Sequence, residues 1–414
     1  MATQSAIATT TAPGVRKVWY APNGFEAYGE AEIKAVDQCL RDGWLAGFGK
    51  RTVEFEKRVA AMFGKKFGLF VNSGSSACLL GLASLDLPKG SKVVTPACTF
   101  STTVAPIIQL GLEPVFCDVS AETYVSTVEQ VMGAVTAETR AVMVPNLIGN
   151  LPDWAGLKAA LVAAGRGDVI LIEDSADTIG HTPQEGTDIS ITSFYASHVI
   201  TACGSGGMVM FNDERHLKRA CMMRDWGRIG TNSEEVSERF AHEVDGIPYD
   251  FKFLYGVLGY NFKSSEVNAA FGLVQLDRLV ENLSIRKRNF ERYLANLADL
   301  AAQELLQLPP PDSSVHWLAI PFQVPDGKRL GLLTFLEDSH IQTRVTFSGN
   351  ITRHPVYRQY LAEYPNADRI MSDAFLLGCH HGMSLEDVDY VCAQIRRFLA
   401  CEQEAGAKAT AQQP

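Results

Sequence analysis

The chain has 414 residues and a formal net charge of −10, and 46% of its residues are hydrophobic. This length and composition predict a soluble globular protein with a sizeable core and exclude a disordered or fibrous chain. Basic residues occur only in short groups such as Lys65-Lys66. Together with the acidic balance, this excludes nucleic acid and an anionic membrane surface as expected partners.

The sequence shows no signal for a membrane or for secretion. No apolar run approaches the roughly 20 residues that span a bilayer, and residues 1–13 lack the basic and apolar regions of a signal peptide. Nine scattered cysteines without C-x-C or C-x-x-C spacing indicate reduced thiols. The neighbouring His380 and His381 would point in different directions on a regular element. We therefore expect a cytoplasmic protein without a metal site.

The first half of the chain alternates between helical and strand patterns. Helices are expected at 31–41 and 53–63, with a loop at 43–47 between them, and a strand at 67–72 leads into a helix at 77–85. Short strands of the buried type follow at 92–95, 113–117, 141–145 and 169–173. This alternation predicts an α/β fold with a mostly parallel sheet flanked by helices. Ligands of such sheets gather at the carboxyl ends of the strands.

The second half predicts a smaller α+β domain at the C-terminus. One long helix is expected at 265–298, and further elements follow the break at 309–311, namely 317–324, 330–338 and 386–400. The expected division is an N-terminal arm (1–30), a large domain (31–285), a small domain (286–402) and a flexible tail (403–414).

Three groups of residues along the large domain suggest a site, although each has an ordinary structural alternative. Gly74-Ser75-Ser76 lies where a strand enters a helix, so it could bind a phosphate or simply cap the helix. Phe100 could lie flat on an aromatic cofactor or belong to the core. Asp174 ends a buried strand, where a carboxylate caps the next element or holds a pyridine nitrogen protonated.

His198 is the most informative residue, because it closes the segment Ser193-Phe194-Tyr195-Ala196-Ser197-His198 ahead of a glycine-rich turn at 204–207. The turn at Gly74-Ser75-Ser76, then Phe100, then Asp174 precede this segment in the chain. In this order of features the chain resembles the fold-type I pyridoxal-phosphate enzymes, and among them the DegT/StrS-type sugar aminotransferase family. The resemblance runs from about residue 31 to 399. It includes the segments 224–228, 258–263, 269–276 and 343–355.

Within that family the chain is similar to the dehydratase branch, in which histidine replaces the Schiff-base lysine. This branch includes the 3-dehydratases of CDP-4-keto-6-deoxyglucose and of GDP-4-keto-6-deoxymannose. A primary amine forms a Schiff base, whereas an imidazole only takes and gives protons at neutral pH. The histidine therefore implies that the cofactor stays free to act as pyridoxamine phosphate.

The resemblance implies a fold-type I transferase fold and a set of residues around pyridoxal 5'-phosphate or pyridoxamine 5'-phosphate. The phosphate would be held by Ser75, Ser76 and Ser193, the ring would be covered by Phe100, Asp174 would pair with the ring nitrogen, and Asp177 would lie near the ring hydroxyl. Asn261 would reach the phosphate of the neighbouring subunit, which implies a homodimer with shared active sites.

The iron–sulfur members of this branch carry cysteines that this chain lacks. Ser175 and Ala176 stand after the aspartate, and the stretch 228–253 contains no cysteine. Without thiolates a [2Fe–2S] cluster is not expected.

The implied reaction is removal of the C3 hydroxyl from a nucleotide-linked 4-keto-6-deoxyhexose, with His198 as the base at cofactor carbon C4'. It would serve deoxysugar biosynthesis for a cell-surface glycan or an antibiotic. The unsaturated product is then either hydrolysed with loss of ammonia, with L-glutamate as amino donor, or reduced by a partner protein. Arg228, Arg344 and Arg353 are candidates for the substrate diphosphate or the glutamate carboxylate, although surface arginines usually form ordinary ion pairs. The alternatives are a sugar aminotransferase and a non-catalytic regulatory protein that binds the cofactor.

Overall fold

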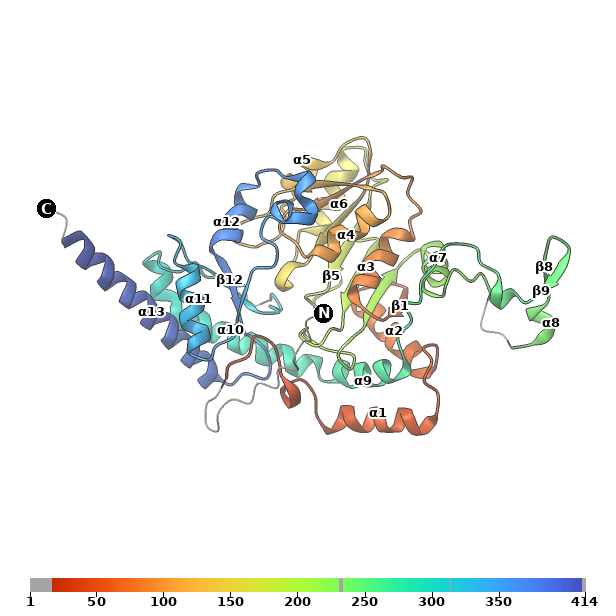
Figure 1. Cartoon of the computed structure of the whole chain (residues 1–414), viewed down its shortest axis with the longest axis horizontal. Helices are drawn as coiled ribbons and strands as arrows, with labels where there is room; N and C mark the ends of the chain where they lie inside the picture. Colours follow the sequence, from red (N-terminus) through yellow and green to blue (C-terminus); the bar gives the residue numbers. More distant parts are fainter. Residues whose placement is uncertain (1–16, 231–233, 313, 412–414) are drawn as a thin grey trace, which may run out of the picture.

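The computed structural model describes residues 17–230, 234–312 and 314–411 (Figure 1). A large α/β domain and a smaller C-terminal domain pack side by side, and a hairpin arm (residues 234–260) projects from the large domain. Among the described residues, no helix is both long and apolar enough to cross a membrane.

The large domain is built on a seven-stranded sheet with the order β1-β7-β6-β5-β4-β2-β3. Its strands are β1 (Phe67–Val71), β2 (Lys92–Pro96), β3 (Glu113–Cys117), β4 (Thr139–Pro145), β5 (Ile170–Ser175), β6 (Ile189–Ser193) and β7 (Gly207–Phe211). Only β7 runs against the others, because it pairs antiparallel with both β1 and β6. The prediction of a mostly parallel sheet is confirmed.

Helices cover both faces of this sheet. The helices of the large domain are α1 (Glu30–Asp42), which packs on α9, and α2 (Lys50–Met62), α3 (Gly74–Ala83), α4 (Ser101–Gln109), α5 (Val128–Ala134), α6 (Trp154–Ala163), α7 (Glu214–Arg224) and α9 (Glu266–Asp277). Helices α3, α4 and α7 pack on one face with Leu69 and Val71 of β1, whereas α2 packs on the other face with Phe70. This alternation follows from the period of two in a strand. At the carboxyl ends of β4 and β5, Pro145 and Asp174 line a cavity.

The prediction of a single helix at 265–298 is wrong, because two helices occupy that region. Helix α9 ends at Asp277, Arg278 is both its C-cap and the N-cap of the next helix, and α10 (Leu279–Ala302) follows directly. The apolar pattern continues across the break, so hydrophobic periodicity alone gave no sign of it.

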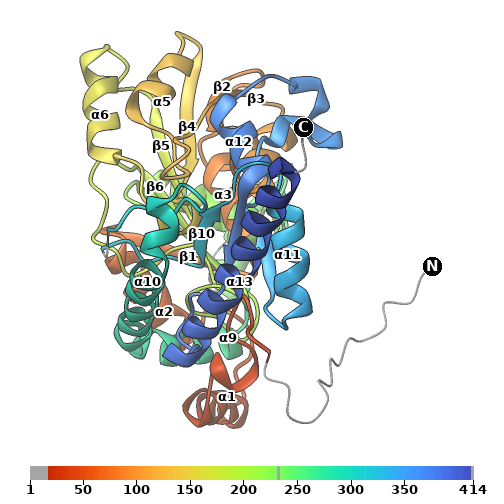
Figure 2. The ribbon, with the colours of Figure 1, turned by 90° about the vertical axis from the view of Figure 1, so that its left-hand side faces the viewer.

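The small domain is a three-stranded antiparallel sheet packed against helices. It contains β10 (Ile320–Gln323), β11 (Thr343–Val345) and β12 (Ala374–Leu377) in the order β10-β12-β11, with α11 (Arg329–Asp338), α12 (Pro365–Asp373) and α13 (Leu385–Ala411). Helices α10 and α13 lie along each other on the side shown in Figure 2. Helix α10 crosses the boundary expected between 285 and 286, and α13 extends to Ala411, where a flexible tail was expected from 403.

Among the elements without a counterpart in the sequence-based expectation are two strands of the large sheet and a hairpin arm. Strands β6 and β7 lie directly before and after the segment that holds His198 and the glycine-rich turn, and they were not distinguished from that loop. The hairpin arm (residues 234–260) contains α8 (Val236–Arg239), β8 (His242–Val244) and β9 (Ile247–Tyr249), and it extends away from the body of the molecule (Figure 1).

The first described residues are anchored to the small domain. Val18 pairs with Ile341 as a parallel bridge, and the Val18 amide donates to the His340 carbonyl oxygen at 2.9 Å. The expected N-terminal arm (1–30) is therefore docked from residue 17 onward, while residues 1–16 lie outside the described part.

The close approach of β7 to the start of α3 generates a stability prediction. A Cβ atom on Gly207 would lie 2.2 Å from the Ser73 carbonyl oxygen and 2.6 Å from the Gly74 amide nitrogen. Gly207→Ala should therefore lower the free energy of unfolding by about 1 to 3 kcal/mol in urea denaturation, because backbone atoms must move. Gly133→Ala is the control, since a Cβ there meets nothing within 4 Å, and it should be neutral or stabilising. Equal stability of the two variants would contradict the prediction.

Candidate active site

A cavity of about 520 Å³ lies at the carboxyl ends of the central strands, between the large and small domains. Its wall brings together seven of the residues expected from the sequence, namely Ser75, Phe100, Asp174, Asp177, Ser193, His198 and Arg344. The remaining four, Ser76, Arg228, Asn261 and Arg353, do not line it.

The turn between β1 and α3 offers hydrogen-bond donors to an anion. Ser73 is the N-cap of α3, and its Oγ accepts a hydrogen bond from the Ser76 amide at 3.1 Å. The Ser76 hydroxyl donates to Asn72 Oδ1 at 2.7 Å, so this buried side chain supports the turn. Among the described residues, the amides of Gly74 and Ser75 have no acceptor. They begin a helix of ten residues, where the helix dipole favours an anion.

Ser193 faces this turn from the end of β6. A Cβ atom on Gly74 would lie 2.7 Å from the Ser193 Cβ, so only glycine lets the two segments approach so closely. Ser73, Ser75 and Ser193 therefore present hydroxyl groups to the cavity beside the helix N-terminus, as a phosphate requires.

Asp174 lies at the end of β5 and is 4% exposed. Its Oδ2 accepts hydrogen bonds from Thr103 Oγ1 at 2.8 Å and from Cys78 Sγ at 3.6 Å, and its Oδ1 accepts one from the Ala176 amide at 3.2 Å. Burial raises the pKa of this carboxyl group, and the hydrogen bonds from Thr103, Ala176 and Cys78 oppose the shift. The groups that shift this pKa include no basic side chain among the described residues. The site therefore favours a cationic ligand atom at Asp174.

Asp177 follows one turn later and also faces the cavity. Its Oδ2 accepts a hydrogen bond from the Ile148 amide at 2.9 Å. Burial raises its pKa from 3.8 to about 7, and the nearby Asp174 carboxylate adds to the rise. At neutral pH this side chain can therefore be either a donor or an acceptor.

His198 lies on the turn after β6, where its amide donates to the Tyr195 carbonyl oxygen at 3.0 Å. Its Nδ1 is 3.4 Å from the Ser193 carbonyl oxygen. A carbonyl oxygen can only accept, so this contact places the proton on Nδ1 and leaves the Nε2 lone pair free. Burial lowers the pKa of His198 to about 4. The imidazole is therefore neutral at pH 7 and can accept a proton.

Phe100 is the N-cap residue of α4 and is 53% exposed, so the alternative of a core position is wrong. Its ring lies at the cavity wall, 6.1 Å from the ring of Phe347 in an edge-to-face arrangement. An exposed phenyl ring in this place is available for contact with a ligand.

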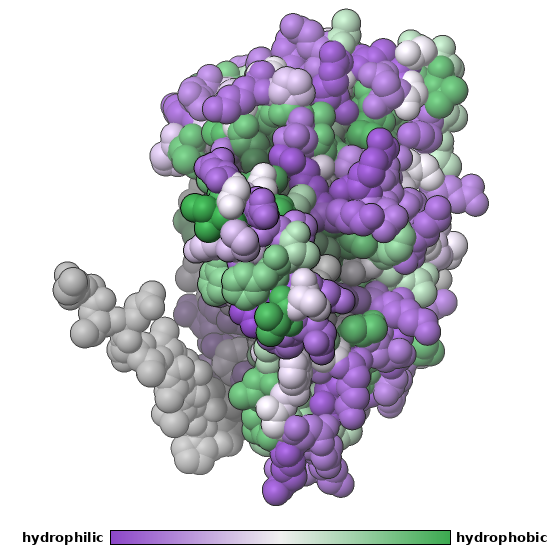
Figure 3. Space-filling model, turned by 90° about the vertical axis from the view of Figure 1, so that its right-hand side faces the viewer, coloured by the Kyte–Doolittle hydropathy of each residue, from purple (hydrophilic) through white to green (hydrophobic). Residues whose placement is uncertain are grey.

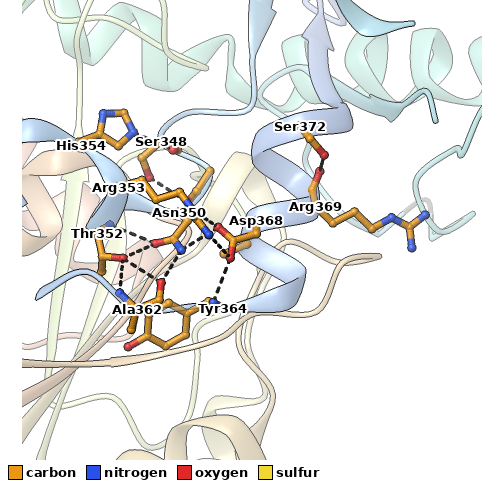
Figure 4. Close-up of polar contacts among 12 residues, drawn as sticks. Ser348, Asn350, Thr352, Arg353, His354, Ala362, Tyr364, Asp368, Arg369 and Ser372 are labelled. Atoms are coloured by element: carbon orange, nitrogen blue, oxygen red, sulfur yellow. Dashed lines mark hydrogen bonds and ion pairs between the residues drawn. The ribbon is translucent and has the colours of Figure 1, made fainter. Parts of the chain in front are cut away.

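Arg344 and Arg353 come from the small domain but have different surroundings. Arg344, on β11, is exposed and lines the cavity, where its guanidinium lies 5.4 Å from the Tyr20 ring centroid. Arg353 forms an ion pair with Asp368, which also accepts a hydrogen bond from Asn350 Nδ2 at 2.8 Å (Figure 4). The ordinary ion-pair alternative therefore describes the contacts of Arg353.

Arg228 and Asn261 lie together at the base of the hairpin arm. Asn261 is exposed and pairs with Asp225 as an antiparallel bridge. The Arg228 guanidinium stacks on Trp226, at 4.5 Å from the ring centroid, and Lys263 contacts the same ring at 4.5 Å. These side chains lie outside the cavity of their own chain.

Several cavity residues were not identified from the sequence. Thr103 and Cys78 contact Asp174, and Tyr20 and Phe347 line the wall on the side of the small domain. Thr103 stands one helical turn after Phe100, so its place on the face of α4 could have been anticipated. Tyr20 offered no sequence signal, because its position depends on the docking of the N-terminal segment. Among the described residues, no group of three His, Cys, Asp or Glu side chains is arranged to hold a metal ion.

Comparison with protein families gives one match that covers most of the chain. The model of the DegT/DnrJ/EryC1/StrS aminotransferase family matches residues 26–396.

Two relatives and one solved structure are informative. The chain is 34% identical over 406 residues to the lipopolysaccharide biosynthesis protein RfbH of Salmonella typhimurium, with 91% of each chain covered. It is 35% identical over 405 residues to the dTDP-4-dehydro-2,6-dideoxy-D-glucose 3-dehydratase of Saccharopolyspora spinosa, covering 92% of this chain and 86% of the relative. The structure of the E. coli GDP-4-keto-6-deoxy-D-mannose-3-dehydratase with bound hydrated PLP superposes with a TM-score of 0.80 at 24% identity, covering 92% of this chain and all of that one. The fold is therefore that of the pyridoxal-phosphate transferases.

The raised pKa of Asp177 predicts a pH dependence of stability. The folded state binds this proton more tightly than the unfolded state, so the stabilisation is present below about pH 4 and is lost as pH rises through 7. In urea titrations of the dialysed protein, the stability of the wild type relative to Asp177→Asn should fall by about 2 to 4 kcal/mol over this range. Asp168→Asn is the control, because the Arg166 ion pair lowers the pKa of Asp168. Its stability difference from the wild type should stay nearly constant above about pH 5, and the opposite slope should appear only below about pH 4, where the ion pair is lost. A flat difference for Asp177→Asn would contradict the burial of an ionisable carboxyl group there.

Proposed function

The chain belongs to the DegT/DnrJ/EryC1/StrS aminotransferase family, and we propose that it removes the C3 hydroxyl from a nucleotide-linked 4-keto-6-deoxyhexose with pyridoxamine 5'-phosphate as cofactor. Its place would be deoxysugar biosynthesis in the cytoplasm, for a cell-surface glycan or an antibiotic. Relatives named as a 3-dehydratase and as a lipopolysaccharide biosynthesis protein support this assignment.

The single observation that carries the proposal is the imidazole of His198 in a cavity without an amine. None of the described residues that line the cavity is a lysine. A transaminase of this fold needs a primary amine to hold its cofactor between turnovers. With a neutral imidazole instead, the site is suited to proton transfer.

The donor set of the cavity fits pyridoxamine phosphate. The free amides of Gly74 and Ser75, with the hydroxyls of Ser75 and Ser193, would hold the phosphate. Asp174, buried and without a basic partner, would pair with the protonated ring nitrogen. Phe100 offers its exposed ring to the cofactor ring.

When bound, the cofactor supplies a primary amine for the keto carbon and a ring that accepts electrons. Asp174 would keep the ring nitrogen protonated, so that the ring can accept electrons. His198 would present its free Nε2 as the base for the proton at cofactor carbon C4', because the Ser193 carbonyl oxygen holds Nδ1. The protonated imidazole would then be the acid for the C3 hydroxyl, which would leave as water.

The family description names aminotransferases, so transamination is the second candidate. It requires an amine that can enter the cavity. Lys263 lies two residues after Asn261. Its ammonium group is 3.5 Å from Asp225 Oδ1 and lies over the rings of Phe48 and Trp226. These contacts favour the dehydratase.

We propose further that the protein is a homodimer in which Asn261 reaches the cofactor phosphate of the partner. Its exposed position outside its own cavity supports this. The hairpin arm beside it carries exposed apolar side chains, namely Val236, Phe240, Val244, Ile247, Tyr249, Phe253, Tyr255, Leu258 and Tyr260. Apolar patches are visible on this side of the molecule in Figure 3. Such a surface is typical of a protein contact.

Turnover with a panel of CDP-, GDP- and dTDP-4-keto-6-deoxyhexoses tests the reaction. Purified protein with pyridoxamine phosphate should give a product that lacks the C3 oxygen by mass spectrometry. We expect glutamate to sustain turnover with release of ammonia and 2-oxoglutarate. This hydrolytic route needs neither a reductase nor an iron–sulfur cluster. Turnover that continues only with an added reductase would support the reductive route.

Replacement of His198 tests the base. His198→Asn should lower kcat by about 10² to 10⁴ fold while cofactor affinity stays near that of the wild type. His198→Lys should become covalently attached to pyridoxal phosphate, and borohydride reduction followed by peptide mapping would place the cofactor on residue 198. A wild-type protein that already attaches the cofactor through Lys252 or Lys263 would overturn the proposal.

Mixing two inactive variants tests the shared site. Each mixed dimer of His198→Asn and Asn261→Ala subunits contains one site with His198 and Asn261 both intact. Co-refolded subunits should therefore recover about one quarter of the wild-type activity if the dimer is shared as proposed. His198→Asn refolded alone is the control, and no recovery in the mixture would exclude a contribution of Asn261 in trans.

A further inference from the structure

The cavity has two walls of different chemistry. The wall from the large domain carries the serine hydroxyls, Asp174 and His198, which fit the cofactor. The opposite wall comes from the small domain and the N-terminal segment, and it is mostly apolar, with Leu318, Val345, Phe347 and Leu376. Tyr20 and Arg344 are the side chains with polar groups on this second wall.

The N-terminal segment that carries Tyr20 is fixed by several contacts. The Tyr20 amide donates to Gln342 Oε1 at 3.1 Å, and the Gln342 amide donates to the Val18 carbonyl oxygen at 2.9 Å. The Trp19 carbonyl oxygen contacts His380 Nε2 at 3.1 Å, and it lies 2.3 Å from where a Cβ on Gly378 would be. Tyr20 is therefore held in the cavity by the segment that leads into β11.

Tyr20 and Arg344 form one unit. The guanidinium of Arg344 lies 5.4 Å from the ring centroid of Tyr20 and donates to the Thr343 carbonyl oxygen at 2.7 Å. Among the described residues, the Tyr20 hydroxyl has no hydrogen-bond partner. Burial raises the pKa of Tyr20, so the phenol stays protonated and remains a donor. An aromatic face, a phenol donor and a cation side by side suit a sugar ring followed by a phosphate.

We propose that Tyr20 is the residue that positions the hexose of a nucleoside diphosphate sugar, with its ring against the sugar and its hydroxyl donating to a sugar oxygen. Arg344 pairs with the adjoining phosphate. This inference rests on the proposed function for the identity of the ligand. It adds a role for a residue of the N-terminal segment in selecting the sugar.

Equilibrium binding of unreactive nucleotides tests this role without turnover. The probes are dTDP-glucose, GDP-mannose and CDP-glucose, together with the matching nucleoside diphosphates, titrated into the cofactor-loaded protein by calorimetry. Tyr20→Ala should weaken the bound nucleotide sugar by at least about tenfold and Tyr20→Phe by about two- to tenfold, as for the loss of one hydrogen bond. Neither variant should change the affinity for the nucleoside diphosphate by more than about twofold. Arg344→Met should weaken both kinds of probe.

The controls separate this role from damage to the fold and from failure of the proposed reaction. Tyr390→Phe removes a phenol on α13 whose hydroxyl donates to the Ser339 carbonyl oxygen, and it should bind every probe as the wild type does. Cofactor affinity, followed by absorbance, should be unchanged in both Tyr20 variants. If Tyr20→Ala binds the nucleotide sugar as tightly as the wild type, the role of Tyr20 is wrong even where the ketosugars are turned over. If the wild type and variants bind the probes as expected but the wild type converts no ketosugar, the proposed dehydration is wrong, whereas the proposed role of Tyr20 in binding the sugar is supported. A wild type that binds none of the probes overturns both.

Discussion

The chemistry of this site depends on a buried carboxylate at the end of the central strand that has no basic partner. Strand β5 is the middle strand of the sheet, and Asp174 ends it with only neutral donors around its oxygens. A buried carboxylate is unfavourable unless it is paired or hydrogen-bonded. Glu173, one residue earlier, is also fully buried but faces the other side of the sheet, because side chains alternate along a strand. Of Glu173 and Asp174, only Asp174 can therefore form an ion pair with a cation in the cavity.

The two walls of the cavity are joined by one strained loop. Ile148 has φ of 61°, a left-handed conformation that is rare for a β-branched residue. Its amide donates to Asp177 on the large domain, and its carbonyl oxygen accepts from the Leu318 amide of the small domain at 2.8 Å. Gly149 follows with a positive φ, and a Cβ there would lie 2.2 Å from the His316 carbonyl oxygen. The strain is thus compensated by hydrogen bonds that fix the distance between the walls.

Much of the fold and part of the site could be predicted from the sequence, because those features depend on local patterns. Strand β3 begins and ends where the apolar run predicts, and Asp174 and His198 face one cavity because strand ends of a parallel sheet meet at one edge. Features that depend on distant contacts were missed. The break at Arg278 interrupts no apolar pattern, and Tyr20 enters the site only through the pairing of Val18 with Ile341. Arg353 is an error in the other direction: it was a candidate for the site, but it does not line the cavity. Its ion pair with Asp368 could not be inferred from spacing along the chain.

Helix α10 runs without interruption from the large domain into the small one, and one hydrophobic core extends across both. Phe55 and Phe194 of the large domain belong to the same cluster as Phe290, Trp317 and Phe375. A hinge between the domains would have to bend this helix and expose that cluster to water. Opening of the cleft by rigid-body rotation is therefore unfavourable, and passage of a ligand is left to side chains at the rim, where Phe100 and Tyr195 are more than half exposed. Rotamer changes of two aromatic rings, which take place far faster than domain motions, would then set how quickly a ligand enters and leaves.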